Sequence, residues 1–220
     1  MGCKEKLDKD LISRTVAEST NDNLLLYTLY AYFYLAMYLN ELDIIDMLTA
    51  ELHKRKTSAQ WVLPFSKTYQ LFCEGVAAAS QGRTNKARLR VARKKLAKLK
   101  QQGEHSPSNI WNKVCLIEAE LEACSGRTDS AILLYDKAIQ LAEKQGFVNE
   151  QALACEKAGL VLMTSGRAGD ADWYITRARA LYRRWGANKK VDQLVKLLNH
   201  DKHAKCYVAS GSGGGSLQAD

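Results

Sequence analysis

The residue types best suited to hold a metal ion lie near the C-terminus, where His200, His203 and Cys206 form an H-x-x-H-x-x-C tract. Imidazole nitrogens and thiolate sulfur are common zinc ligands, and on a helix these three positions lie roughly on one face. The tract shortly precedes Ser210–Ser216, a Ser/Gly run typical of a flexible linker, so no neighbouring element would hold the ligands in place. We therefore predict neither a metal site nor a cofactor.

The N-terminus and the other histidines offer little further chemistry. Met1-Gly2-Cys3 matches the start of an acylation signal, but Lys6 stands where Ser or Thr is typical, so we do not expect acylation. His53 and His105 are isolated from other catalytic residue types. The sequence contains no phosphate-binding loop, dinucleotide-binding glycine motif, nucleophile elbow or kinase signature. It therefore predicts a protein without catalytic residues, that is, not an enzyme.

A strongly basic segment is the clearest candidate for binding. Residues 83–100 hold nine Lys and Arg and no acid, more positive charge than the net +8 of the whole chain. Apolar residues fall on one helical face of this segment, so the bases cover the rest of its surface. Three interpretations stay open: a solvated face, a docking face for an acidic partner or an anionic membrane surface, and a nucleic-acid-binding face. The last is the least favoured, because no aromatic side chains for base stacking are interleaved with the bases. The candidate docking residues are Arg90, Arg93, Lys94 and Lys98.

These residues must be positioned by a repeated element. The pattern G-R-x-x-x-A occurs at Gly82, Gly126 and Gly166, with glycines 44 and 40 residues apart, and a degenerate copy centres on Asn40. Gly or Asn commonly ends a helix because either can adopt the left-handed backbone conformation. The next helix should then begin within a few residues, capped by Thr84, Thr128 or a neighbouring Asp or Asn.

Small residues recur at fixed places around these turns. The alanines of the pattern are Ala87, Ala131 and Ala171, and seven residues before each glycine lies Gly75, Ala119 or Gly159. Small side chains at both places would let two antiparallel helices of a pair touch closely. The pattern therefore predicts that each turn joins a helical hairpin.

The fold class that follows is all-α, a right-handed superhelical stack of antiparallel helix pairs. Residues 1–20, with a short helix in Leu7–Glu18, are expected to be the end of a preceding helical unit. Residues 21–199 are expected to form about four helix pairs plus a terminal helix. Residues 200–220 are expected to be a flexible Gly/Ser linker. The expected helices are Asn23–Leu39, Leu42–Arg55, Pro64–Ser80, Asn85–Gln101, Pro107–Cys124, Thr128–Lys144, Asn149–Thr164, Gly169–Trp185 and Lys189–Asn199.

The apolar run Leu24–Leu39 is better explained as a buried repeat helix than as a membrane span. It has 16 residues, fewer than the roughly 20 that a span needs, and it carries five tyrosines. The six cysteines occur singly, without a C-x-x-C pair, and the N-terminus shows no secretory signal. Reduced thiols and a cytoplasmic location are therefore expected.

The spacing of small residues resembles the tetratricopeptide consensus, best at Ala119, Gly126, Ala131, Tyr135 and Ala138. The family's Trp, its second-helix Pro and its 34-residue period are missing here. Leu24–Leu194 also resembles the C-terminal helical-repeat region of large signalling ATPases, which join serine/threonine kinase-like, ATPase, repeat, GAF and sensor histidine kinase domains. The segments that carry this second resemblance are Asn112–Leu134, Asp136–Ala158 and Ala178–Leu194, the last with W-G-A-x-x-K-V at 185–191. It implies a signalling context and transfers no catalytic residue.

The expected function is a non-catalytic protein-interaction or intramolecular scaffold module. A concave groove formed by the first helix of each pair would receive a peptide or a neighbouring domain. The candidate groove residues are Tyr32, Tyr69, Glu118, Glu122 and Glu156. The alternatives are a free-standing adaptor that binds a separate protein, and a nucleic-acid-binding repeat that uses residues 83–100.

Overall fold

The computed structural model describes residues 7–55 and 64–198, and within these ranges all regular structure is helical. The described chain ends in a further helical stretch at residues 188–198. The helices before it are α1 (Lys9–Glu18), α2 (Asp22–Leu39), α3 (Leu42–Lys54), α4 (Pro64–Ser80), α5 (Lys86–His105), α6 (Pro107–Cys124), α7 (Thr128–Lys144), α8 (Val148–Thr164) and α9 (Ala168–Trp185). The all-α prediction is confirmed for this part of the chain, and most helix ends agree with the prediction to within one residue.

One turn structure ends four helices in succession, at intervals of 20 residues. Gly126, Gly146, Gly166 and Gly186 all have φ between 74° and 85°. After α6, the amide of Arg127 donates to the Glu122 carbonyl (3.0 Å) and the amide of Gly126 to the Ala123 carbonyl (3.1 Å). This is the hydrogen-bond pattern that satisfies the last carbonyls of a helix when a left-handed residue follows it. The same two bonds recur at the other three glycines, so one local device sets the length of every helix from α7 to α9.

The two earlier turns differ from this glycine turn. Asn40 ends α2 in the left-handed conformation, with φ 59°, as predicted from its place in the repeat. Gly82 lies in the turn between α4 and α5, but it is not among the residues with positive φ. A side chain there would collide with Leu89, because an added Cβ would lie 2.3 Å from its Cδ2. The Asn85 side chain caps α5, whereas no side chain caps α7, so the predicted Thr128 cap is wrong.

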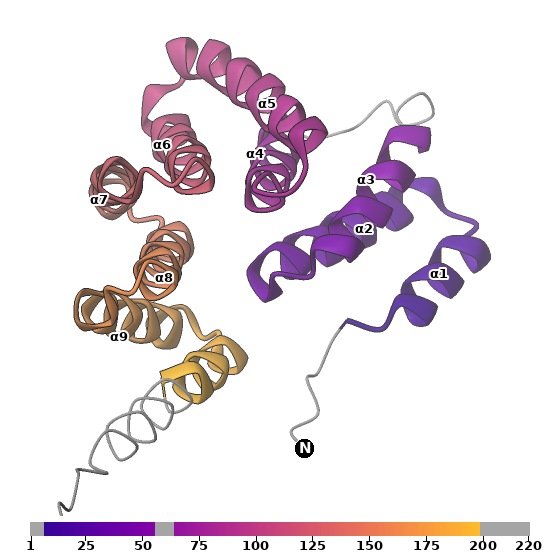
Figure 1. Ribbon diagram of the computed structural model, residues 1–220. Helices are drawn as coiled ribbons and strands as arrows, with labels where there is room; N and C mark the ends of the chain where they lie inside the picture. The colour runs from indigo at the N-terminus through magenta and orange to yellow at the C-terminus, as the bar shows by residue number, and fades with distance from the viewer. Residues whose placement is uncertain (1–6, 56–63, 199–220) are drawn as a thin grey trace, which may run out of the picture.

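The helix pairs follow one another in an arc. Figure 1 shows α4, α6 and α8 toward the inside of this arc and α5, α7 and α9 toward the outside. The contacts between α4 and α5, α6 and α7, and α8 and α9 are the most extensive in the molecule, so the predicted hairpins are confirmed. One continuous cluster of buried apolar residues runs from α1 to the terminal helix, as a stack of repeats requires.

Small residues do bring the paired helices together in the later repeats. Ala131 and Ala171 are fully buried, and an added Cβ on Gly159 would lie 2.5 Å from Ile175 Cδ1. Ala87 differs, because it is exposed on α5, so the crossing predicted for it does not occur there. The pattern places a small residue at an equivalent sequence position, but only tertiary packing decides whether that position meets another helix.

Helix α5 is longer than predicted. The expected end was Gln101, but the helix continues through Gly103 to His105. Gly103 is buried, and an added Cβ would lie 3.5–3.6 Å from Trp111 and Ile110 of α6. Close packing of α5 on α6 therefore outweighs the roughly 1 kcal/mol that glycine costs inside a helix.

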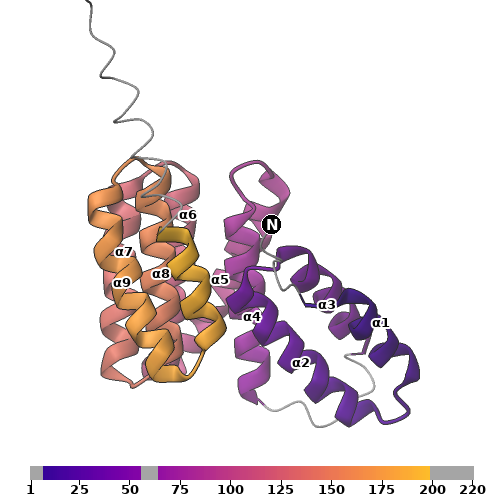
Figure 2. The ribbon, with the colours of Figure 1, turned by 90° about the horizontal axis from the view of Figure 1, so that it is seen from below.

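The α2–α3 pair departs from the regular stack. Both α2 and α3 make far fewer contacts with α4 than α5 makes with α6. Figure 2 shows α1, α2 and α3 inclined away from the parallel helices of the rest of the molecule. In the described ranges no helix is long and apolar enough to cross a membrane, in agreement with the interpretation of Leu24–Leu39 as a buried helix.

Candidate functional site

The basic segment does not form a single face. Arg90, Arg93, Lys94 and Lys98 are all exposed on α5, as an amphipathic helix predicts. Of these four residues, Lys94 and Lys98 line a cleft between α5 and the α2–α3 pair, whereas Arg90 and Arg93 do not. The four candidate docking residues are thus divided between the cleft and the remaining surface of the helix.

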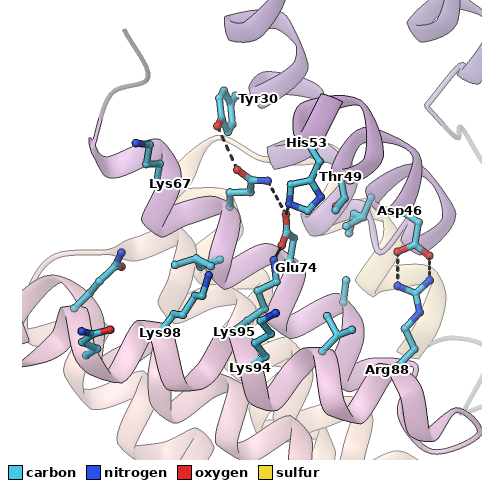
Figure 3. Close-up of a pocket in the computed structure, with 17 residues that line it drawn as sticks. Tyr30, Asp46, Thr49, His53, Lys67, Glu74, Arg88, Lys94, Lys95 and Lys98 are labelled. Carbon is cyan, nitrogen blue, oxygen red and sulfur yellow. Dashed lines mark hydrogen bonds and ion pairs between the residues drawn. The ribbon is translucent and has the colours of Figure 1, made fainter. Parts of the chain in front are cut away.

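The cleft, which we call the basic cleft, has a volume of about 870 Å³. It lies where the α2–α3 pair leaves the regular stack, and it is drawn in Figure 3. Its charged lining comprises Asp46, His53, Lys67, Glu74, Arg88, Lys94, Lys95 and Lys98. Apolar side chains of Ile45, Leu71, Ala77 and Val91 also line it.

Both acids of the basic cleft are held by cations across it. Asp46 on α3 accepts two hydrogen bonds from the guanidinium of Arg88 on α5, one of them 2.7 Å long. Glu74 on α4 is only 4% exposed; it accepts from Gln70 Nε2 at 2.6 Å and from Lys95 Nζ. Figure 3 shows both ion pairs as dashed contacts. These two pairs tie α3 and α4 to α5 and so fix the width of the cleft.

The five predicted groove residues lie in different environments. Tyr32 and Tyr69 are half-buried on α2 and α4 and pack against the core. Glu118 lies 2.6 Å from Lys100 Nζ of α5, and Glu122 accepts from the guanidinium of Arg127 at 2.8 Å. Glu156 is buried. The structure therefore does not bring the three glutamates together on one surface.

The inner side of the arc is instead occupied by α2. Tyr34 and Tyr38 of α2 reach the far end of the array, where Asn149 of α8 donates to their hydroxyl oxygens at 2.8 and 2.9 Å. The Trp185 ring of α9 lies 4.9 Å from the Tyr38 ring and 5.9 Å from the Tyr34 ring. Tyr69 of α4 stacks on Tyr34 at 5.0 Å. Aromatic pairs at these separations stabilise their contact beyond simple burial. We call Tyr34, Tyr38, Tyr69, Tyr182 and Trp185 the inner aromatic cluster; Tyr69 is its only member among the predicted groove residues.

The tyrosine hydroxyls of this cluster are neutral donors and acceptors. Burial raises the pKa of Tyr38 and of Tyr69 well above the usual range, and neighbouring tyrosines and Glu150 raise it further. Both hydroxyls therefore keep their protons at physiological pH and can hydrogen-bond within the cluster. Tyr69 Oη lies 3.4 Å from Tyr38 Oη.

A buried ion pair joins two inner helices, α6 and α8. Lys113 of α6 and Glu150 of α8 are less than 10% exposed, and Lys113 Nζ lies 2.8 Å from Glu150 Oε2. Lys113 also donates to the Asn109 carbonyl at 2.8 Å, and its ammonium lies 4.9 Å from the centre of the Phe147 ring. Since these partners satisfy the lysine, the pair contributes to the position of α8 against α6.

A recurring polar contact links successive repeats at two places, and no sequence pattern predicted it. Glu156 of α8 accepts from Tyr182 Oη of α9 and from Lys190 Nζ of the terminal helix, each at 2.6 Å. One repeat earlier, Glu120 of α6 accepts from Tyr135 Oη of α7 and lies 3.5 Å from Lys157 Nζ of α8. In both cases the glutamate is buried, the tyrosine comes from its paired helix and the lysine from the next inner helix. Because Glu156 is buried and bonded to Tyr182 and Lys190, it joins neighbouring helices and does not line a groove.

The described ranges hold no group of three His, Cys, Asp or Glu that could bind a metal ion. His200, His203 and Cys206 lie outside the described residues, as do Met1-Gly2-Cys3 and the predicted linker at 200–220. Burial raises the pKa of the Cys73 thiol, and that of Cys155 to about 12, so these two cysteines remain protonated.

Comparisons with known proteins found no relative from which a function could be transferred. No protein-family model matches the chain, no curated protein is significantly similar to it, and no solved structure matches it. The helical-repeat architecture is compatible with a tetratricopeptide-like region.

Proposed function

We propose that this chain is a non-catalytic helical-repeat scaffold that binds protein segments on the inner side of its arc, beside the docked α2, where Trp185 is still 36% exposed. The observation that supports this most is the docking of α2, whose Tyr34 and Tyr38 bind Asn149 from the inner side. An inner surface that holds one helix of its own polypeptide has the chemistry to hold protein: aromatic rings for contact area and an amide for orientation.

The proposed partners are neighbouring domains of the same polypeptide. The resemblance to the repeat region of signalling ATPases with a sensor histidine kinase supports this context, and with it a right-handed superhelix and a cytoplasmic, signal-transducing protein. In such an architecture the array would pass a structural change between flanking domains. A free-standing adaptor is the alternative, and it differs in that its partner is a separate protein.

The test uses two tryptophans of α9 as a matched pair. Trp185 belongs to the inner aromatic cluster, whereas Trp173 is 56% exposed and its ring contacts are with Tyr174 and Arg177 of its own helix. The segments encoded on either side of this chain would be expressed separately, and their binding to the chain measured by isothermal titration calorimetry. We expect Trp185→Ala to weaken binding at least tenfold and Trp173→Ala less than twofold.

Two results would contradict the proposal. If neither flanking segment binds at 100 µM, the chain is not an intramolecular scaffold, and a reading frame without flanking domains would favour the adaptor. If Trp173→Ala weakens binding as much as Trp185→Ala, the partner does not use the inner side of the arc. Circular dichroism melting of both variants shows whether either has lost its fold.

A further inference from the structure

The basic cleft arises from a break in the regular stack. Farther along the chain, outer helices pack closely on the next inner helix, as α5 does on α6 and α7 on α8. The corresponding packing of α3 on α4 is sparse, so α3 and α5 stand apart and the cleft opens between them. Its volume of about 870 Å³ lies within the 300–1,000 Å³ typical of small-molecule sites.

The charge of the cleft is unbalanced. Its two acids are already paired, Asp46 with Arg88 and Glu74 with Lys95. Lys67 of α4 and Lys94 and Lys98 of α5 also line it, and none of these three forms an ion pair with any carboxylate among the described residues. Three ammonium groups from two helices therefore border one concave space, and within residues 7–55 and 64–198 none of them is paired with a carboxylate.

Neutral donors accompany these lysines. Gln101 and Gln102 of α5 line the same cleft. The Thr68 hydroxyl donates to Gln102 Oε1 at 3.1 Å, which leaves the amide nitrogen of Gln102 available as a donor. Lysine ammoniums supplemented by amide donors are a chemistry suited to phosphate, which carries several negative charges on closely spaced oxygens.

We propose that the basic cleft binds a small phosphate-bearing anion through Lys67, Lys94 and Lys98. A small ligand fits better than an acidic protein or a nucleic acid, because the three lysines line one concave space and Arg90 and Arg93, which lie off the cleft, do not extend them into a continuous basic track. The apolar side chains of Ile45 and Leu71 can accommodate an organic portion of the ligand. The basic cleft shares no residue with the inner aromatic cluster, so a test of phosphate binding does not depend on the scaffold function.

The test compares two double substitutions that remove the same charge from one helix. Lys94→Gln/Lys98→Gln alters the cleft, and Arg90→Gln/Arg93→Gln alters α5 outside it. Sodium tripolyphosphate would be titrated into each protein by calorimetry in 0.15 M NaCl without divalent metal. We expect the wild type to bind with a micromolar dissociation constant, the Lys94/Lys98 variant at least tenfold more weakly, and the Arg90/Arg93 variant within threefold of the wild type.

Tighter binding of adenosine triphosphate than of tripolyphosphate, with the same variant dependence, would identify an organic phosphate as the ligand. Equal binding of the two would identify an inorganic phosphate.

Several outcomes would overturn the proposal. Equal weakening in both double variants would assign the binding to general charge, since non-specific attraction depends on net charge and falls with salt. No heat of binding at 1 mM tripolyphosphate would exclude the site. Tighter binding of a hexaglutamate peptide or of a single-stranded oligonucleotide would replace the phosphate ligand with that class of partner. Equal melting temperatures of the three proteins by circular dichroism would show that lost binding is not lost folding.

Discussion

The buried contact between Glu156 and Lys190 allows a quantitative test of how the last repeat is held. Glu156 is 7% exposed and Lys190 is 4% exposed, and the two side chains meet at 2.6 Å. The Tyr182 hydroxyl donates to the same carboxylate at 2.6 Å. Substituting Lys190 by Met keeps the length and apolar stem of the side chain but leaves the carboxylate with a single neutral donor.

The expected loss follows from the burial of that carboxylate. Removing one partner of a buried ion pair typically costs about 3–5 kcal/mol, because the other charge stays buried without compensation. The loss has a ceiling, because the terminal helix can detach and admit water at the cost of exposing Val191 and Leu194. Burial of an aliphatic side chain contributes about 1.5–3 kcal/mol, so Val191 and Leu194 alone set this ceiling at no less than roughly 3–6 kcal/mol, and the partly buried Leu197 and Leu198 raise it. Since Tyr182 still donates, we expect Lys190→Met to lower the free energy of unfolding by about 3 kcal/mol.

Urea unfolding at pH 7 measures this loss, and hydrogen exchange in residues 188–198 shows whether the terminal helix opens alone. The double variant Glu156→Gln/Lys190→Met should be at least about 1.5 kcal/mol more stable than Lys190→Met, since a buried amide costs less than a buried charge. Lys54→Met is the control, because Lys54 pairs with Glu51 on the surface at 3.3 Å and such pairs contribute about 0–1 kcal/mol. A loss below about 1 kcal/mol for Lys190→Met, or no recovery in the double variant, would refute the reasoning.

Three further predictions concern the repeat turns, the helix crossings and the thiols. Ala131→Leu should overpack the fully buried crossing of α6 and α7 and cost about 1–3 kcal/mol in urea unfolding, and an unchanged midpoint would contradict this. Gly126→Ala should cost about 1–2 kcal/mol through its φ of 78° alone, because no atom lies within 4 Å of an added Cβ. In peptide-resolved alkylation at pH 8, Cys124 should react before Cys73 and Cys155: burial raises the pKa of all three thiols, but only Cys124 among them is half-exposed to the reagent, and equal rates would argue against this packing.

The helices could be predicted closely because their ends are set by local chemistry. Thr128–Lys144 and Pro64–Ser80 agree with the structure at both ends, since a Gly, Pro or Ser near each end acts within one turn of chain. The glycines at 146 and 186 use the same turn as Gly126, but they lack the following Arg that made the repeat visible. A search for Gly at 20-residue intervals would have found them.

The candidate site could be predicted only in part, because its contacts are distant in the sequence. The basic helix was evident from composition, yet whether a base lines a cleft depends on where α3 stands, which no local pattern specifies. Glu156 was expected in a groove, but Tyr182 and Lys190, 26 and 34 residues later, surround it. Likewise Tyr38 and Asn149 are separated by 111 residues. Contacts of this kind follow from the curvature of the whole array.

The curvature also accounts for the unusual apolar run of α2. An amphipathic helix buries one face, but α2 contacts other helices on more than one side. Leu25, Leu29, Phe33 and Tyr38 belong to the continuous core, and Tyr34 and Tyr38 also meet α8 and α9 across the arc. Figure 1 shows the α2–α3 pair lying across the open side of the arc, between α4 and the terminal helix. Tyrosine suits the second contact because its ring packs while its hydroxyl binds the polar Asn149. Helix α3, the partner of α2, packs loosely on α4, and the basic cleft lies at this gap, so the placement of the α2–α3 pair bears on both surfaces.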